Sequence, residues 1–415
     1  MGLRGCIVLL LLSLFTIIGG CVQQGANVVL PKGIPVIRVR LMQDRRELLV
    51  GASDTVYAKS AADMVPQPIN FPRSPGSAVR IAGGYWYAGN VPLGTGELTL
   101  TPSTEGSMTI DAQLYRGRFR LVPVSATTFD VVNDVDVDGY LKSVISKELY
   151  PGWDDQTYRA QAIVARTYAI FESRTIGARR YWDVYPDQRS QVYGGMALET
   201  SKSTRAVDAT RGIVVVAGPA GQERIFKAYF SSCCGGRSQS AFDAFGDEYS
   251  LPLSEQNRGT TCSDSAKFNW GPVAVRKTEL ARRFAIWAKR KSDQQGKPRP
   301  ELQMDGVNRI DPAFLNKVGR PIQFYVTDNS GMHFLMRGED LRSAICTDAL
   351  AGSVVYSGYF NTVNDAQSIR FIDGHGYGHG VGLCQFCAQR EALSGWRHED
   401  IVVNAYPGSK LIRAY

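Results

Sequence analysis

The first third of the chain alternates short β-prone runs with turns. The runs Val36–Leu41, Glu47–Val50, Leu98–Thr101 and Phe119–Val122 are separated by segments rich in Gly, Pro and Ser. Short strands at this spacing, bounded by turn residues, are typical of an antiparallel β module. No helical periodicity of useful length occurs among them. We therefore expect a β-rich module over residues 34–125.

Two helical patterns follow this module. Gly139–Leu149 carries apolar residues on one face, and Gln156–Glu172 is rich in alanine with no glycine or proline inside it. Good helix formers without breakers favour a helix over this length. Strand-like runs come next at Gly212–Ala217 and Ile225–Phe230. The pattern thus changes from a β module to a mixed core with a central helix pair.

The last third begins with a basic amphipathic pattern. It predicts a helix at Thr278–Ser292, strands at Pro321–Val326 and His333–Met336, a helix at Cys387–Leu393 and a final strand. A glycine-rich segment at 373–387 precedes the last helix, with five glycines within ten residues. Glycine allows backbone conformations closed to other residues and lets a ligand approach closely. This segment is either a pocket-lining loop or a structural turn cluster.

The order of these elements predicts an α+β fold. A β-rich N-terminal module is followed by a mixed α/β catalytic core with a central helix pair and an inserted α/β subdomain. At 415 residues the chain is long enough for two or three domains. The expected division is a signal peptide at 1–20, a linker at 21–33, the β module at 34–125, the first part of the core at 130–270, the insertion at 271–370 and the C-terminal part of the core, with its His/Gly-rich loop, at 371–415.

One carboxyl interrupts the apolar face of the first predicted helix. Leu141, Val144, Ile145 and Glu148 stand at i, i+3, i+4 and i+7, and therefore lie on one side of the helix. Loss of water disfavours the ionised form and raises the pKa of a carboxyl, which suits a general acid near neutral pH. The alternative is a frayed last turn with the carboxyl in solvent, because a Pro-Gly pair at 151–152 ends the helix.

Composition and charge narrow the class of partner. The chain is 44% hydrophobic and 21% charged, as in a folded protein, and its formal net charge is +8. A positive balance favours an anionic partner. Because no long basic tract interleaved with aromatic residues occurs, nucleic acid is not expected as a partner.

The N-terminus is typical of an export signal. Arg4 precedes an apolar stretch at Ile7–Ile18, and two glycines then lead to Cys21. A stretch of this length is too short to cross a hydrocarbon core of about 30 Å as a helix. The segment resembles a bacterial lipoprotein signal, in which Cys21 is acylated. We expect an exported lipoprotein anchored to a membrane in the cell envelope (periplasm), with a plain cleaved secretory signal as the alternative.

The cysteines beyond the predicted signal allow two interpretations. The spacing His375-x3-His379-x4-Cys384-x2-Cys387 has the residue types of a zinc site. It matches no common zinc-finger pattern, and no Glu stands between the histidines as the base of a zinc protease. Disulfides are favoured over zinc because an exported protein folds in an oxidising compartment. No cofactor is required, and the candidates for a structural zinc are Cys233, Cys234, Cys262, His375, Cys384 and Cys387.

Other polar and aromatic residues also allow two interpretations each. Phe230–Gly236 could present a nucleophilic thiol or serine, but neighbouring cysteines in exported proteins more often form bridges. Gln161 and Arg166 on the alanine-rich helix either form a solvated face or orient a substrate and fix Glu148 by a hydrogen bond. Tyr193 either stacks on a sugar or packs in the core.

Several sequence blocks stand in a defined order from about Asp134 to the C-terminus. They are Tyr140–Glu148 with Pro151 and Trp153, the helix Ala160–Ala169, Gln191–Gly195, Tyr229–Gly236, Gly378–Gln385 and Tyr406–Gly408. Together they resemble the SpoIID/LytB family of bacterial cell-wall proteins. Cys387 stands where the family usually has glycine, and Cys233 beside Cys234 departs from the family's small-residue turn.

The resemblance implies a lytic transglycosylase that cleaves peptidoglycan glycan strands stripped of their stem peptides. It implies Glu148 as both acid and base, giving 1,6-anhydromuramic ends. The residues carried over to the substrate cleft are Gln161, Arg166, Tyr193, Ser232, His379 and Gln385. Some relatives bind zinc through His and Cys near the turn after Tyr229, where this sequence has no His.

Two rival functions remain from the sequence. The family resemblance also fits a non-catalytic cell-wall protein that enhances an N-acetylmuramoyl-L-alanine amidase. The second rival is an exported thiol or zinc hydrolase that uses the region of His379 and Cys384. The expected partners are therefore glycan strands, a cell-wall amidase and, through the lipid anchor, a membrane.

Overall fold

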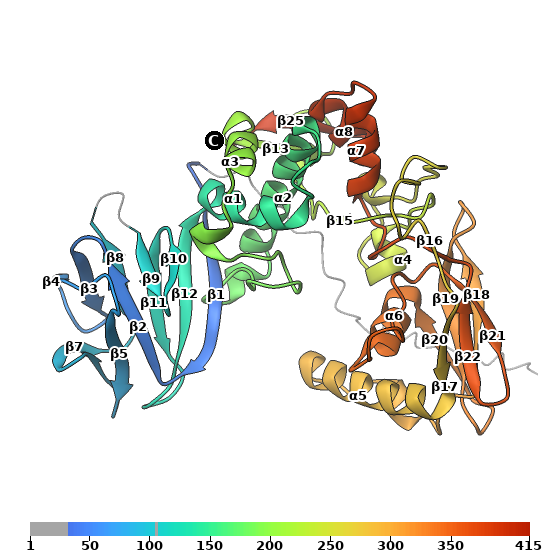
Figure 1. The fold of residues 1–415 in the computed structure, drawn as a ribbon, viewed down its shortest axis with the longest axis horizontal. Helices are drawn as coiled ribbons and strands as arrows, with labels where there is room; N and C mark the ends of the chain where they lie inside the picture. Colours follow the sequence, from blue (N-terminus) through green and yellow to red (C-terminus); the bar gives the residue numbers. More distant parts are fainter. Residues whose placement is uncertain (1–31, 104–106) are drawn as a thin grey trace, which may run out of the picture.

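The computed structural model describes residues 32–103 and 107–415. They form an arch, with a β-rich module at one end, a helical core at the top and a second α/β lobe at the other end (Figure 1). The predicted α+β class with a β-rich N-terminal module is confirmed. The predicted signal and Cys21 lie outside the described residues. No helix in the described ranges is long and apolar enough to span a bilayer.

Two six-stranded sheets make up the β-rich module. Its strands are β1 (Val36–Arg45), β2 (Glu47–Ala52), β3 (Val56–Ser60), β4 (Gln67–Ile69), β5 (Ser77–Ala82), β6 (Tyr85–Ala88), β7 (Val91–Thr95), β8 (Leu98–Pro102), β9 (Met108–Ile110), β10 (Gln113–Tyr115), β11 (Arg118–Pro123) and β12 (Phe129–Asp136). The sheet orders are β1-β12-β11-β8-β3-β4 and β10-β9-β2-β5-β6-β7. Apolar side chains of both sheets share one core, as the alternating burial of β3 illustrates.

Strand β12 links the module to the core. It pairs antiparallel with β1 on one side and β11 on the other, and its residues are buried up to the last. Its two buried aspartates are paired with arginines of the neighbouring strands, Asp130 with Arg40 and Asp134 with Arg120. The sheet therefore extends beyond the expected end at residue 125, and the first core helix starts directly where β12 ends.

The helical core combines two separate parts of the chain, residues 137–225 and residues 385–413. Its elements are α1 (Val137–Glu148), α2 (Asp155–Arg174), η1 (Gly177–Arg179), η2 (Gly195–Leu198), α3 (Ser201–Ala209), β13 (Ile213–Ala217), β14 (Arg224–Ile225), α7 (Gln385–Leu393), α8 (His398–Ala405) and β25 (Ser409–Arg413). Strand β25 pairs with β13 and so brings the chain end back to the core. Asp136 and Asp154 cap α1 and α2 by accepting backbone N–H groups.

The second lobe has a hydrophobic core of its own between Val273 and Phe371. Its elements are β16 (Asn269–Trp270), β17 (Val273–Arg276), α5 (Lys277–Gln295), η4 (Pro300–Gln303), β18 (Arg309–Leu315), β19 (Pro321–Thr327), β20 (His333–Arg337), α6 (Gly338–Cys346), β21 (Asn361–Asn364) and β22 (Ser368–Ile372). Short elements connect this lobe to the core: β15 (Phe230–Ser231), α4 (Ala241–Phe245), η3 (Leu251–Leu253), β23 (Gly374–His375) and β24 (Leu383–Cys384).

Two sequence-based assignments need correction. The single strand expected at Ile225–Phe230 is wrong, because the chain leaves one sheet for another: β14 pairs with β13, whereas β15 pairs in parallel with β24. Helices α3, α6 and α8 were not predicted. They are only eight or nine residues long and carry too few turns for a clear apolar period.

Candidate active site

Glu148 ends helix α1, and the predicted helix phase is confirmed. Leu141, Val144 and Ile145 are fully buried on the same face, and the Glu148 side chain is half-buried beside them. The frayed last turn does not occur, because α1 keeps its helical form to Glu148. The carboxyl is therefore held at the boundary between the apolar core and the surface.

Two donors from distant parts of the chain reach this carboxyl. The Gln385 amide Nε2 donates to Oε2 of Glu148 at 3.4 Å, and the backbone N–H of Val192 donates to the same carboxylate. Burial raises the pKa of Glu148 from its ordinary 4.5 to about 7, and both hydrogen bonds act against that rise. Near neutral pH the group thus populates its acid and its conjugate base about equally, as a group that must serve in both roles requires.

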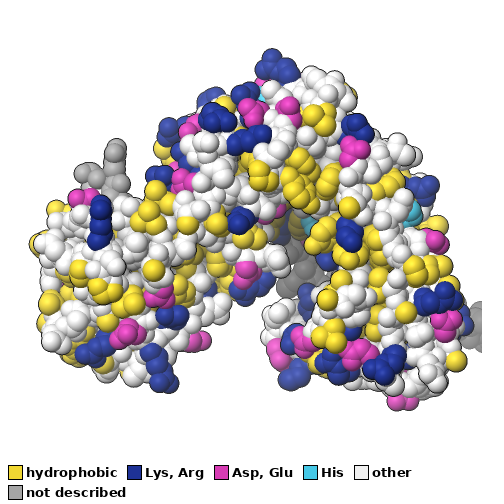
Figure 2. Space-filling model, in the orientation of Figure 1, with side chains coloured by type: hydrophobic (Ala, Val, Ile, Leu, Met, Phe, Trp, Pro, Cys, Tyr) yellow, Lys and Arg dark blue, Asp and Glu magenta, His cyan; other side chains and the backbone are white. Residues whose placement is uncertain are grey.

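Three aromatic side chains surround the end of α1. Trp153 contacts Phe386 edge-on at 4.9 Å between ring centroids, and Tyr150 lies 5.2 Å from Trp153. Tyr150 is 60% exposed, whereas the other two are half-buried. On the space-filling surface, hydrophobic side chains gather at the upper inner edge of the hollow between the two lobes (Figure 2). Aromatic rings flanking an acid in this way offer apolar faces to a sugar ring.

The sequence interpretation missed Tyr150 and Phe386 as site residues. A signal for both was available, because Tyr150 is two residues from Glu148 and Phe386 directly follows Gln385. Neither position implied proximity to the other, since the two residues are 236 positions apart in the sequence. Only the return of the C-terminal segment to the core brings them into contact.

A short parallel pairing holds Gln385 in place. Phe230 and Ser231 of β15 pair with Leu383 and Cys384 of β24, and the Phe386 N–H donates to the Ser232 carbonyl at 3.1 Å. The backbone of the predicted site residue Ser232 thus supports the segment that carries Gln385. Helix α7 is further tied to α2, because the Gln389 amide oxygen accepts from Asp154 and Thr157.

Two predicted cleft residues lie inside the core. Arg166 is fully buried, and its guanidinium donates to Asp138 at 2.9 Å and to the Val207 carbonyl at 3.2 Å. Gln161 is also fully buried, and its amide atoms have no hydrogen-bond partner within the described residues. Neither hydrogen-bonds Glu148, so the orienting role expected for them falls to Gln385 and the Val192 N–H.

Tyr193 takes the packing alternative. Its ring is 5% exposed and lies against Tyr140 and Tyr115, and its hydroxyl donates to Asn133 at 2.8 Å. Within the described residues it has no free face for a sugar. It contributes to the site indirectly, because its packing fixes the adjacent Val192, whose N–H reaches Glu148.

His379 packs against aromatic side chains. Its ring lies 5.3 Å from Phe245 and 5.8 Å from Tyr229, and its Nδ1 accepts the Val381 N–H at 3.0 Å. Burial lowers the pKa of His379 to about 4, so the ring is neutral at pH 7. His379 is not bonded to a thiol within the described residues, which disfavours the thiol-hydrolase interpretation.

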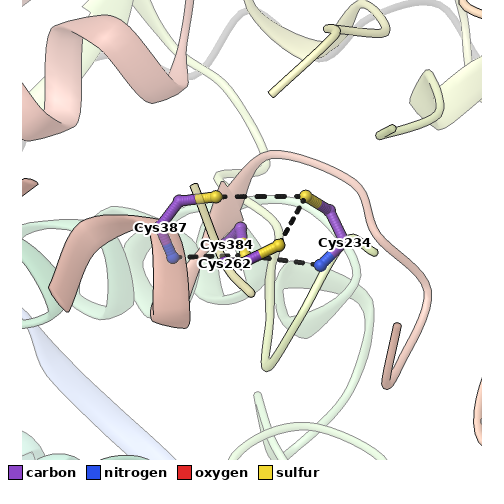
Figure 3. A group of neighbouring side chains, drawn as sticks. All are labelled: Cys234, Cys262, Cys384 and Cys387. Atoms are coloured by element: carbon purple, nitrogen blue, oxygen red, sulfur yellow. Dashed lines mark hydrogen bonds between the residues drawn. The ribbon is translucent and has the colours of Figure 1, made fainter. Parts of the chain in front are cut away.

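Four cysteines form the group most able to hold a metal ion. The sulfurs of Cys234, Cys262, Cys384 and Cys387 lie within 4.8 Å of one another, and all four residues are buried (Figure 3). All six cysteines of the described part are free. The remaining candidates are outside this group: Cys233 is adjacent to it, and His375 packs on Tyr359 at 4.6 Å.

Sequence comparisons relate the part of the chain that carries Glu148 to known proteins. Residues 125–216, which contain α1 and α2, match the SpoIID family model, described as Stage II sporulation protein. An uncharacterized protein of Brachyspira hyodysenteriae is 26% identical over 309 residues, covering 74% of this chain and 75% of that protein.

Two relatives come from Bacillus subtilis. The protein named Amidase enhancer is 25% identical over 303 residues, which is 65% of this chain and 40% of that protein. Stage II sporulation protein D is 22% identical over 327 residues, covering 75% and 83%. The chain is thus a relative of the SpoIID/LytB proteins, as its sequence blocks predicted. These relationships support a role related to the cell wall.

Proposed function

We propose that this protein is a lytic transglycosylase that cleaves peptidoglycan glycan strands. The observation that carries the proposal is Glu148, a carboxyl whose pKa is raised to about 7 by burial and which stands beside an aromatic cluster. Such a group can protonate a leaving oxygen at neutral pH and then accept a proton.

The reaction needs only this one carboxyl. Protonated Glu148 gives its proton to the glycosidic oxygen while the bond from that oxygen to the anomeric carbon breaks. The C6 hydroxyl of the muramic residue forms the new bond to the anomeric carbon, and the Glu148 carboxylate takes the hydroxyl proton. The acid is regenerated, no water is consumed, and the product carries a 1,6-anhydro ring.

A hydrolytic glycosidase would place a second carboxylate about 5 to 9.5 Å from the acid. The proposed reaction needs no such partner, because the C6 hydroxyl of the substrate takes the place of water as the attacking group. Gln385 is suited to orient the carboxyl throughout, because an amide donor can bond it in either protonation state.

A second candidate function is supported by the match to the amidase enhancer. In that case the protein would bind the cell wall and stimulate an amidase without cutting glycan. We further propose that either activity is located in the cell envelope, on a membrane-anchored lipoprotein. The support for this is the sequence alone, which predicts an export signal and a lipidated Cys21.

The test is incubation of the purified full chain with denuded glycan strands, followed by mass spectrometry for anhydromuramic ends. We expect such ends from the wild type and a loss of at least about 100-fold in rate for Glu148→Gln, the contribution typical of a general acid. Lys147→Gln, which changes the exposed neighbouring residue, serves as the matched control and should cleave normally.

Two outcomes would reject the proposal. One is an equal rate for Glu148→Gln and the wild type. The other is a folded wild type that releases no anhydromuramic ends but increases the rate of a cell-wall amidase, which would favour the enhancer function.

A further inference from the structure

Three distant segments bring their thiols together at one point. Cys234 follows β15, Cys262 lies in the loop before β16, and Cys384 and Cys387 stand at the start of α7. None of the four is more than 6% exposed. Figure 3 shows their side chains directed toward a common centre. The fold thus buries four thiols from separate segments at one place, and a shared metal ion would account for this arrangement.

The spacing of the sulfurs fits a tetrahedral metal ion. Cys234 Sγ lies 3.6 Å from Cys262 Sγ and 4.0 Å from Cys387 Sγ. Four thiolates about 2.3 Å from a zinc ion stand about 3.8 Å apart along the edges of their tetrahedron. A disulfide requires sulfurs about 2.05 Å apart, so neither pair is at bonding distance.

Backbone donors also surround one of the four sulfurs. The backbone N–H groups of Cys234 and Cys387 both donate toward Cys384 Sγ, at 3.3 and 3.4 Å. Cys384 is the N-cap residue of α7, where the helix dipole stabilises negative charge. Amide donors of this kind are the usual outer partners of metal-bound sulfur.

We propose that Cys234, Cys262, Cys384 and Cys387 bind one Zn²⁺ in a closed tetrathiolate site. All four positions are filled by protein sulfur, which is the arrangement of a structural rather than a catalytic zinc. Cys346 lies apart in α6 and donates to the Val355 carbonyl. Cys233 points to the Cys262 carbonyl and is not a ligand.

The zinc site has a second consequence, which depends on the proposed function. Gln385 and Phe386 lie between the two ligands on α7, and they are the residues that contact Glu148 and Trp153. The metal therefore fixes the start of α7 and with it the positioning residue Gln385. At this point four metal–sulfur bonds, rather than a large hydrophobic core, hold the start of α7 in place.

Metal content tests the first claim without any activity measurement. We expect about one zinc per chain by elemental analysis of the purified full chain. We also expect the thiolate-to-metal charge-transfer and tetrahedral d–d absorption of cobalt after exchange with Co²⁺. Serine at any of the four ligands should abolish the cobalt spectrum, whereas Cys346→Ser and Cys233→Ser should keep it.

Because a ligand variant could misfold, the wild type carries the decisive result. A folded wild type that purifies without zinc, gives no tetrahedral cobalt spectrum after anaerobic reconstitution and shows Cys234–Cys262 or Cys384–Cys387 disulfides by peptide mass mapping would overturn the site.

The positioning claim has its own measurement. Removal of zinc by a chelator should lower kcat at least about tenfold with little change in KM, since Gln385 orients the acid rather than binds the glycan. In the Gln385→Ala background the same treatment should lower kcat much less. If the folded protein has the same kcat with and without zinc, the claim that the metal positions Gln385 is wrong, whereas the claim that the four cysteines bind zinc is unaffected. A wild type that never cleaves glycan would reject the proposed function while the cobalt spectrum still decides the site.

Discussion

Replacing Glu148 by glutamine should make the protein more stable, and increasingly so as the pH rises. The amide keeps the shape of the side chain but cannot ionise. In the folded wild type the pKa of Glu148 is about 7, above its ordinary 4.5, because burial disfavours the charge. The stability associated with the protonated carboxyl is therefore fully present below pH 4.5 and is lost as the pH rises through 7.

The size of the effect follows from the two pKa values. Their difference corresponds to about 3 kcal/mol once the pH exceeds 7. Because the side chain is only half-buried, solvent screening reduces this value, and we expect about 1–3 kcal/mol. For a cooperative unit of 150–250 residues this is a rise in Tm of roughly 2–12 °C for the variant at pH 8.5, with little difference at pH 4.5.

Differential scanning calorimetry of the full chain resolves the transition that contains α1. The wild type, Glu148→Gln and Lys147→Gln are compared from pH 4.5 to 8.5 in one ionic strength. Lys147→Gln should follow the wild type at every pH, because Lys147 is exposed. A constant difference in Tm between Glu148→Gln and the wild type across this range would refute the burial of an ionisable Glu148.

The remaining predictions concern catalysis and the buried arginine. The wild-type cleavage rate should fall about tenfold per pH unit above 7 as the acid form of Glu148 disappears, and a rate that holds constant to pH 9 would contradict this role. Arg166→Ala should lower the free energy of unfolding by about 3 kcal/mol, the low end for a broken buried ion pair, because the Asp138 carboxylate loses its buried guanidinium and keeps only the Tyr415 hydroxyl and the exposed Arg211. The Arg166→Met/Asp138→Asn double variant should regain part of that loss, and its rate per folded molecule should stay near the wild type. A stable Arg166 variant without activity would instead return this residue to the substrate cleft.

The local sequence pattern was enough to predict the helices and strands that show a clear hydrophobic period. The two core helices, the strands at Val36 and Phe119 and the long helix after Lys277 all lie close to the ranges read from the sequence. Short helices such as α3 and α6 could not be predicted from the sequence, since they contain only two or three turns. The strand expected across Ile225–Phe230 failed because its two ends pair with different sheets.

Glu148 could be identified as the candidate acid from sequence alone, because a carboxyl on an otherwise apolar helix face is visible in the local sequence pattern. Its partners could not be selected in this way. Gln385 and Val192 come from segments far along the chain, and only the pairing of β15 with β24 and the return of β25 to β13 bring the C-terminal segment to α1.

The sequence by itself determined the phase of α1, the β-rich start of the chain and the residue types available for chemistry. These depend on neighbours within a few positions, where periodicity and propensity act. Tertiary structure decided which polar groups meet the acid, that Arg166 and Tyr193 pack in the core, and that four thiols share one centre. Such outcomes depend on contacts between residues 28 to 237 positions apart, which no local pattern records. Burial, which sets the pKa of Glu148, exists only once those contacts form.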